Sequence, residues 1–322
     1  MIHADLPAPR EMKTSITAKP PRPQRAFAAY FGRRGTMFRN IAPEAIGISA
    51  EWRGVLPLAR EAGFQGVDLN LDQVAKMVAE ESVDTVKELL ANSHLRAGGW
   101  GLPVACFGTD ENFRSGLATL PQKAKLASEL GSSWCYTWVL SWIDDLTFDE
   151  LFEKLTRRFR AVAEVLKDYG QRIGLEFLEP KTLRDGHQGE FIHTMDGMLE
   201  LCDAIAVGNV GLLLDSWHWH TSRGTVDDLK RLSAGDVVYV HVNDAPAGVE
   251  VDELVDNRRK LPGETGVIDL VGFLRVLSDI GYDGPVTPEP FSKRIAELPD
   301  DEAARETGHA LLRVWQRALG VD

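Results

Sequence analysis

Four apolar stretches of the chain end in a side chain that can bind a metal ion, namely Glu176, Asp215, His241 and Glu289. Each carboxylate or imidazole stands where a core residue would be expected, and three buried carboxylates that converge would repel one another strongly. A divalent cation removes this repulsion. Three carboxylates and one imidazole suit Mn²⁺, Mg²⁺ or Co²⁺, and suit Zn²⁺ less well because no thiolate is present. For each residue alone, the plainer interpretation is a strand that ends in polar loop residues.

Such a site predicts proton-transfer chemistry on an α-hydroxyketone. A metal that binds the carbonyl and hydroxyl oxygens acidifies the carbon between them and stabilises the enediolate. Glu176 and Glu289 come from different strands, so we expect them to bind the metal and also to act as base and acid. Return of the proton to the opposite face gives epimerisation, and return to the next carbon gives isomerisation. Loss of a β-substituent gives elimination, and the residues alone do not choose among the three outcomes.

The elements that must position these residues alternate between strand and helix patterns from Ala45 onward. Eight strands are predicted, at residues 45–49, 66–71, 95–105, 133–139, 173–178, 210–214, 237–242 and 285–289. Alternating units imply a parallel sheet, and eight of them imply an α/β fold of the (β/α)₈ TIM-barrel kind, whose active site lies at the C-terminal ends of the strands. A doubly wound open sheet is the alternative, but no Gly-rich phosphate loop follows the first strand.

Charge and composition limit the partners and divide the chain. The net charge of −12 argues against a nucleic-acid partner, and no apolar run reaches the roughly 20 residues that span a membrane. Residues 1–40 are basic and contain five prolines. We predict that they form an extended arm, mobile or packed on another subunit of a homo-oligomer, before a single barrel domain at 41–322. Three scattered cysteines indicate buried free thiols and a cytoplasmic location.

The strand-end motifs resemble those of the sugar phosphate isomerase/epimerase superfamily, the xylose isomerase-like TIM barrels. The resemblance covers residues from about 45 to 315 and is closest to keto-inositol (inosose) isomerases. The motifs that carry it are Gly174-Leu175-Glu176-Phe177, the run from Asn209 to His220 with Asp215-Ser216-Trp217-His218, His241-Val242-Asn243-Asp244, and Arg259-Lys260-Leu261-Pro262-Gly263 followed by Gly266-Val267-Ile268-Asp269.

The resemblance implies that Glu176, Asp215, His241 and Glu289 hold one divalent ion, first of all Mn²⁺, with Mg²⁺, Co²⁺ or Zn²⁺ as alternatives. It also implies that His218 and Arg259 contact substrate oxygens. The expected activity belongs to carbohydrate metabolism, with a small keto sugar or keto-polyol as the partner. Residues between Asp244 and Asn257 form an insertion relative to the ketose epimerases, so this loop is expected to overhang the pocket.

Tryptophans at or near predicted strand ends are further substrate-contact candidates, since an indole face can stack on the C–H face of a sugar ring. Trp100 is taken as a substrate contact on this ground. The same expectation, weighed against simple packing of the barrel top, applies to Trp138, Trp142, Trp217 and Trp219.

Four other functions compete with the isomerase or epimerase. An AP endonuclease would need additional His and acidic ligands on the third and fourth strands, where this chain has Gly99-Trp100-Gly101 and Tyr136-Thr137-Trp138. A non-catalytic sugar-binding protein would not require the complete four-ligand set. A hydride-shift isomerase would need a second metal and a strand-end lysine. A lyase on a 3-keto sugar or keto-polyol remains the main alternative on the same metal site.

Overall fold

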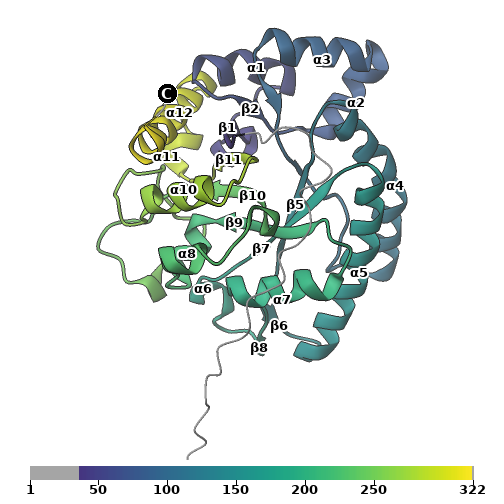
Figure 1. Ribbon diagram of the computed structural model, residues 1–322, viewed down its shortest axis with the longest axis vertical. Helices are drawn as coiled ribbons and strands as arrows, with labels where there is room; N and C mark the ends of the chain where they lie inside the picture. The colour runs from purple at the N-terminus through teal and green to yellow at the C-terminus, as the bar shows by residue number, and fades with distance from the viewer. Residues whose placement is uncertain (1–35, 321–322) are drawn as a thin grey trace, which may run out of the picture.

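The computed structural model describes residues 36–320 and confirms the TIM-barrel prediction (Figure 1). Nine strands form one curled parallel sheet in the order β3-β2-β1-β11-β10-β9-β7-β5-β4. Their bounds are β1 (Phe38–Ile41), β2 (Gly66–Val67), β3 (Arg96–Ala97), β4 (Trp100–Gly101), β5 (Trp134–Val139), β7 (Arg172–Phe177), β9 (Val210–Asp215), β10 (Val237–Val242) and β11 (Pro285–Pro288).

The two ends of this sheet are pieces of one extended segment, which closes the barrel. β3 pairs with β2, while β4 pairs with β5, and only Gly98 and Gly99 separate β3 from β4. A Cβ atom at Gly98 would lie 2.3 Å from Asn40 Oδ1, and one at Gly99 would lie 2.4 Å from the Tyr239 ring. The glycines therefore let the backbone pass close to polar groups inside the barrel. Nine strand pieces thus give the eight strand positions of a TIM barrel.

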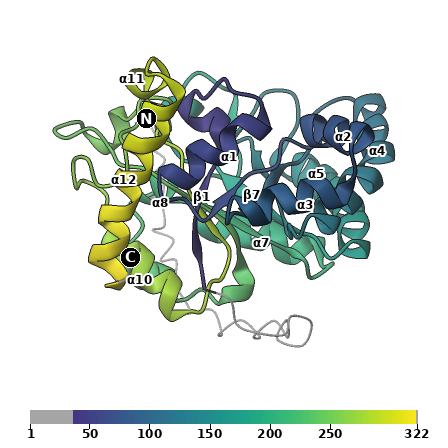
Figure 2. The same ribbon diagram turned by 90° about the horizontal axis from the view of Figure 1, so that it is seen from above.

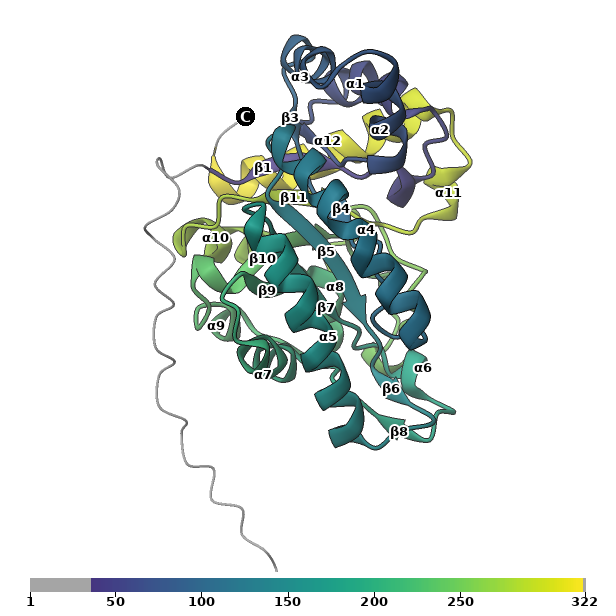
Figure 3. The same cartoon turned by 90° about the vertical axis from the view of Figure 1, so that its right-hand side faces the viewer.

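Helices surround the sheet on its outer side, as Figures 1 and 2 show. Figure 3 shows α4 and α5 side by side along β5, where their apolar faces cover the strands. The helices are α1 (Trp52–Glu61), α2 (Leu71–Glu80), α3 (Val83–Asn92), α4 (Asp110–Glu129), α5 (Phe148–Asp168), α6 (Lys181–Arg184), α7 (Met195–Ile205), α8 (Ser216–Thr221), α9 (Val226–Leu229), α10 (Leu270–Asp279), α11 (Lys293–Ala296) and α12 (Asp300–Leu319). No helix among the described residues is long and apolar enough to cross a membrane.

Shorter elements lie in the loops. The strands β6 (Trp142–Ile143) and β8 (Gly189–Glu190) pair antiparallel outside the barrel. Three single turns of 3₁₀ helix are η1 (Pro43–Ile46), η2 (Ala234–Asp236) and η3 (Val251–Glu253). The last of these lies in the long loop between β10 and α10, which a bridge between Asp244 and Lys260 ties back on itself.

The first strand lies earlier in the chain than predicted. Residues 45–49 were expected to form it, but Pro43–Ile46 is a 3₁₀ turn that ends at Gly47 in the left-handed conformation. Proline at the start of the turn favours this, because its fixed φ is already helical and its missing N–H is not needed there. The strand is instead Phe38–Ile41, which pairs with β11 and β2. Residues 36–40 of the predicted arm are thus described, with 38–40 in the barrel sheet, and residues 1–35 lie outside the described part of the chain.

A buried polar network fills the barrel interior beneath the C-terminal face. Asp68 accepts hydrogen bonds from Asn40 Nδ2 (2.8 Å), the Gly99 amide (2.7 Å), and the hydroxyls of Tyr136 (2.9 Å) and Tyr239 (2.7 Å). Burial raises the pKa of Asp68, and these donors oppose the shift. Because all four donors face its two oxygens, they match a carboxylate without a proton of its own.

Tyr239→Phe is expected to reduce the free energy of unfolding by about 1–3 kcal/mol, because it leaves a buried carboxylate oxygen short of a donor. Urea unfolding of the variant and the wild type measures the difference. Tyr169→Phe, which removes the hydroxyl of a half-buried tyrosine at the end of α5, is the control. An unchanged unfolding free energy for Tyr239→Phe would mean that the network is not part of what stabilises the barrel.

Candidate metal centre

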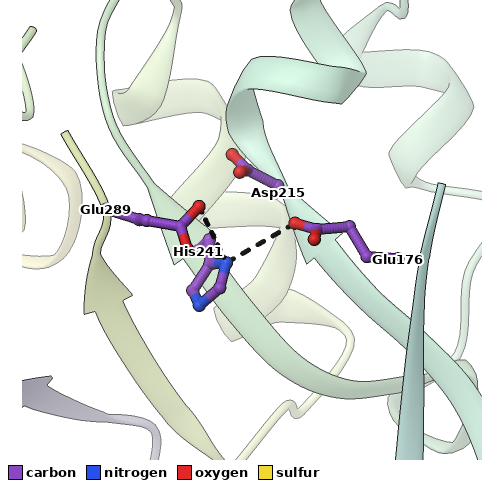
Figure 4. Close-up of side chains that lie close together, drawn as sticks. All are labelled: Glu176, Asp215, His241 and Glu289. Atoms are coloured by element: carbon purple, nitrogen blue, oxygen red, sulfur yellow. Dashed lines mark ion pairs between the residues drawn. The ribbon is translucent and has the colours of Figure 1, made fainter. Parts of the chain in front are cut away.

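Four side chains meet at the C-terminal ends of neighbouring strands. Glu176 lies in β7, Asp215 ends β9, His241 lies in β10, and Glu289 follows β11 directly. The strand register places His241 beside Asp215, and the Glu289 amide continues the ladder by donating to Val242 O at 3.0 Å. One possible ligand atom from each of the four lies within 4.8 Å of the others. Figure 4 shows the side chains pointing toward one another, with Glu176 and Glu289 on either side of His241.

The atoms at the centre of this group fit a bound cation. His241 Nδ1 lies 3.5 Å from Glu176 Oε1 and 3.3 Å from Glu289 Oε2. Two ligands about 2.1 Å from one ion lie roughly 3.0–3.5 Å apart at octahedral or tetrahedral angles, so these spacings match a shared ion. Glu176 Oε1 and His241 Nδ1 are both buried and have no hydrogen-bond partner among the described residues. Orphaned buried polar atoms that face each other are the pattern expected of a metal site.

The electrostatics of these four side chains also favour a bound cation. Burial raises the pKa of Glu176 to about 8. Burial alone would lower the pKa of His241, but the nearby carboxylates of Glu289 and Glu176 raise it well above its ordinary value. Without a metal, these shifts favour a neutral Glu176 and a positively charged His241, which together reduce the net negative charge of the group. A divalent cation can take the place of these protons.

Arg259, a predicted substrate contact, reaches the same centre from the long loop. Its Nη1 atom donates to Asp215 Oδ2 at 2.7 Å and to Glu289 Oε2 at 2.8 Å. Asp256 holds the other side of the guanidinium through its carbonyl oxygen (2.7 Å) and Oδ1 (2.8 Å). Burial is the largest single influence on Asp215 and would raise its pKa, but the charge of Arg259, together with His218, His241 and the hydrogen bond from the Trp217 amide, lowers that pKa overall. The loop between β10 and α10 thus contributes two side chains to this group, Asp256 from the insertion predicted to overhang the pocket and Arg259 from just beyond it.

His218, the other predicted substrate contact, presents a neutral N–H to the centre. It lies in α8, directly after Asp215, and its Nδ1 accepts a hydrogen bond from the Glu179 amide at 3.2 Å. With Nδ1 as acceptor, a neutral ring carries its proton on Nε2, which also lies 3.4 Å from Arg259 Nη2. Burial lowers the pKa of His218 to about 4. Nε2 lies 4.0 Å from Glu176 Oε1 and 3.7 Å from Asp256 Oδ1. A neutral imidazole in this position can donate to a substrate oxygen and does not add charge to the site.

Trp100 does not line the cavity beside the four clustered side chains, and its role as a substrate contact stays a prediction. The indole is buried, and Nε1 donates to Gln171 Oε1 at 3.0 Å, just before the start of β7. Gln171 lies at the N-terminal end of that strand, away from Glu176, so the ring packs inside the lower barrel. Trp138 is different, because it pairs with Glu176 in the register and is 51% exposed.

A cavity of about 460 Å³ adjoins the metal ligands and contains residues that the sequence pattern did not single out. His241 and Glu289 line one part of it, and its other polar wall residues are Glu44, Ser49, Asp68, Asn70, Gln73 and Tyr136. For two of them the sequence contains a signal that could have indicated the cavity, because Asp68 and Asn70 alternate with apolar residues at the end of a predicted strand. Glu44 and Gln73 lie in η1 and α2, which strand-end patterns do not address.

Comparisons with known proteins agree with this geometry. Residues 56–314 match the family described as xylose isomerase-like TIM barrel. Inosose isomerase of Halalkalibacterium halodurans is 22% identical over 83% of this chain and 92% of its own length. Ketose 3-epimerase of Arthrobacter globiformis is 26% identical over 75% of this chain and 78% of its own length. 3-Dehydroshikimate dehydratase of Pseudomonas aeruginosa is 26% identical over 87% of this chain but 42% of its own length.

Solved structures share the fold. A xylose isomerase domain protein from Alicyclobacillus acidocaldarius superposes with a TM-score of 0.79 at 30% identity, over 88% of this chain and 99% of its own. The IOLI protein, whose crystal structure contains a zinc atom, superposes with a TM-score of 0.73 at 21% identity, over 88% of this chain and 100% of its own.

Proposed function

Because the chain belongs to the xylose isomerase-like TIM barrel family, we propose that it is a divalent-metal-dependent isomerase or epimerase of a keto sugar or keto-inositol. The observation that carries the proposal is the convergence of Glu176 and Glu289 on His241 Nδ1 from either side (Figure 4). The isomerase and epimerase among the relatives support the reaction class. The cysteines at 106, 135 and 202 are buried and form no disulfide with one another, which supports a cytoplasmic location.

Glu176, Asp215, His241 and Glu289 would hold the metal. Three carboxylates and an imidazole favour Mn²⁺, with Mg²⁺, Co²⁺ and Zn²⁺ as alternatives, and the zinc of the IOLI structure supports a divalent ion in this fold. Bound there, the ion would stabilise negative charge that develops on the substrate's carbonyl oxygen. Arg259 holds Asp215 and Glu289 in place through its Nη1 atom.

The two glutamates, Glu176 and Glu289, would then transfer the proton. One carboxylate removes the proton from the carbon next to the carbonyl, and the other, on the far side, returns a proton. The His218 Nε2–H donates to a substrate oxygen and fixes the ring relative to the glutamates. Return to the opposite face gives the epimer, and return to the adjacent carbon gives the isomer.

Elimination is the second candidate, because the dehydratase of Pseudomonas aeruginosa matches 87% of this chain. The first proton abstraction is the same in that reaction. A hydroxyl or other group on the β-carbon then leaves instead of a proton returning, and a protonated glutamate gives the departing oxygen its proton. The two candidates differ in the product and share the site.

A substrate panel in D₂O tests the proposed function. Keto-inositols, free ketoses and 3-keto glycosides are incubated with the Mn²⁺-loaded protein and followed by NMR. We expect deuterium at the carbon beside the carbonyl in product or recovered substrate. An unsaturated product would select elimination. Transfer of the substrate hydrogen without any solvent exchange would contradict proton transfer, and absence of both exchange and turnover across the panel would overturn the proposal.

A further inference from the structure

The cavity beside the metal ligands extends well beyond them, toward the ends of β1 and β2. From His241 and Glu289 it reaches η1 and the first turns of α1 and α2. Its volume of about 460 Å³ falls in the range of about 300–1,000 Å³ that is usual for small-molecule pockets. Apolar residues such as Ile48, Val55 and Leu69 line its sides. The cavity therefore has a far wall that a substrate held at the metal can reach.

The charge of the lining is negative. Glu44, Asp68 and Glu289 are acidic, and none of the residues that line the cavity in the described part of the chain is Lys or Arg. The side chain of Arg259, beside Glu289, is 1% exposed and is already bonded to Asp215, Glu289 and Asp256. A phosphate or carboxylate on the substrate would find no partner cation there and would be repelled by the acidic groups.

The far wall offers hydrogen-bonding groups that suit hydroxyls. Asn70 Nδ2 donates to Glu44 Oε1 at 3.2 Å, and Glu44 Oε2 has no hydrogen-bond partner within residues 36–320. Gln73 Oε1 accepts from the Trp52 amide at 2.6 Å, which fixes the side-chain amide and leaves its Nε2 as a donor. A hydroxyl group both donates and accepts, so it can bond to Glu44 and to Gln73.

We infer that Glu44 and Gln73 form a distal subsite that binds hydroxyl groups of an uncharged polyol, and that the cavity rejects substrates with a phosphate or carboxylate. The inference rests on the proposed function, in that the reacting end of the substrate lies at the metal ligands. It selects among the chemistries of the relatives: a neutral keto-inositol or free ketose fits the cavity, whereas a carboxylated ring such as a dehydroshikimate does not.

Binding without turnover tests the subsite. Isothermal titration calorimetry of the Mn²⁺-loaded protein is performed with myo-inositol, myo-inositol 1-phosphate and shikimate, none of which carries the ketone needed for reaction. We expect myo-inositol to bind, and the two anions to bind at least tenfold more weakly. Glu44→Gln should weaken myo-inositol binding about fivefold, because the hydroxyl loses a charged acceptor. Glu44→Lys should strengthen binding of the phosphate.

Glu88→Gln removes the same charge from an exposed position on α3 and should leave all three affinities unchanged. The inference is overturned if either anion binds the wild type as tightly as myo-inositol, if myo-inositol does not bind at all, or if Glu44→Gln binds it like the wild type. No step of this experiment needs catalysis. A protein that shows no turnover in the D₂O panel can therefore still prefer myo-inositol over the two anions, so the proposed function and the subsite are tested independently.

Discussion

Replacing Glu289 by Gln is expected to lower kcat by on the order of 10²–10⁴-fold, the usual contribution of a general acid or base. The amide keeps the size of the side chain and one oxygen that can bind a metal, but it no longer accepts a proton from carbon. Glu176→Gln should behave in the same way, because the two carboxylates lie on either side of His241 Nδ1. Steady-state kinetics at saturating Mn²⁺ on the substrate found in the D₂O panel measure the loss.

Two comparisons make this result specific to proton transfer. Glu297→Gln, at the exposed end of α11, removes the same charge outside the site and should leave kcat unchanged. His218→Ala removes an N–H donor that is neither metal ligand nor base, so it should act mainly on KM. A Glu289→Gln enzyme that keeps its full kcat with metal bound would show that Glu289 moves no proton in the rate-limiting chemistry.

The central strands were predictable because their sequences are dominated by burial. Leu212, Leu213 and Leu214 form an unbroken apolar run in a strand that is covered on both faces, and such runs are typical of parallel sheets. The first strand was missed because two of its four residues are Arg39 and Asn40. Asn40 is fully buried, but the network with Asp68 that makes this tolerable exists only in the folded barrel.

The cluster of four side chains that could hold a metal was accessible from sequence for a similar reason. A carboxylate or imidazole at the end of a buried strand contradicts the local pattern, so Glu176, Asp215 and His241 stand out. Trp100 shows the limit of this reasoning, because residue type near a strand end does not tell whether the side chain faces the mouth of the barrel or its lower core. Glu44 and Gln73 reach the cavity from a 3₁₀ turn and a helix, so their placement depends on how those elements dock.

Metal binding is expected to be required for activity and to become tighter as the pH rises from about 6 to about 8. The pKa of Glu176 is raised to about 8, and that of His241 is raised by Glu289 and Glu176, so both groups hold protons in the metal-free protein at the lower pH. A metal must displace those protons, and each proton released makes the affinity up to roughly tenfold stronger per pH unit. Above the pKa of a group, its contribution to this dependence disappears.

Calorimetric titration of the EDTA-treated protein with Mn²⁺ at pH 6, 7 and 8, in two buffers of different ionisation enthalpy, gives both the affinity and the number of protons released.

Replacing Asp215 by Asn should weaken Mn²⁺ binding more than loss of an outer-shell partner of a metal ligand, which typically costs about 10–100-fold in affinity. The Asn variant also removes the charge that Arg259 neutralises. Asp252→Asn, on the exposed part of the long loop, is the control and should leave the Mn²⁺ affinity unchanged.

EDTA should abolish turnover, and Mn²⁺, Co²⁺ or Mg²⁺ should restore it. An affinity independent of pH, or turnover that survives EDTA in a protein shown by elemental analysis to contain no metal, would contradict the assignment of these four residues as a metal site.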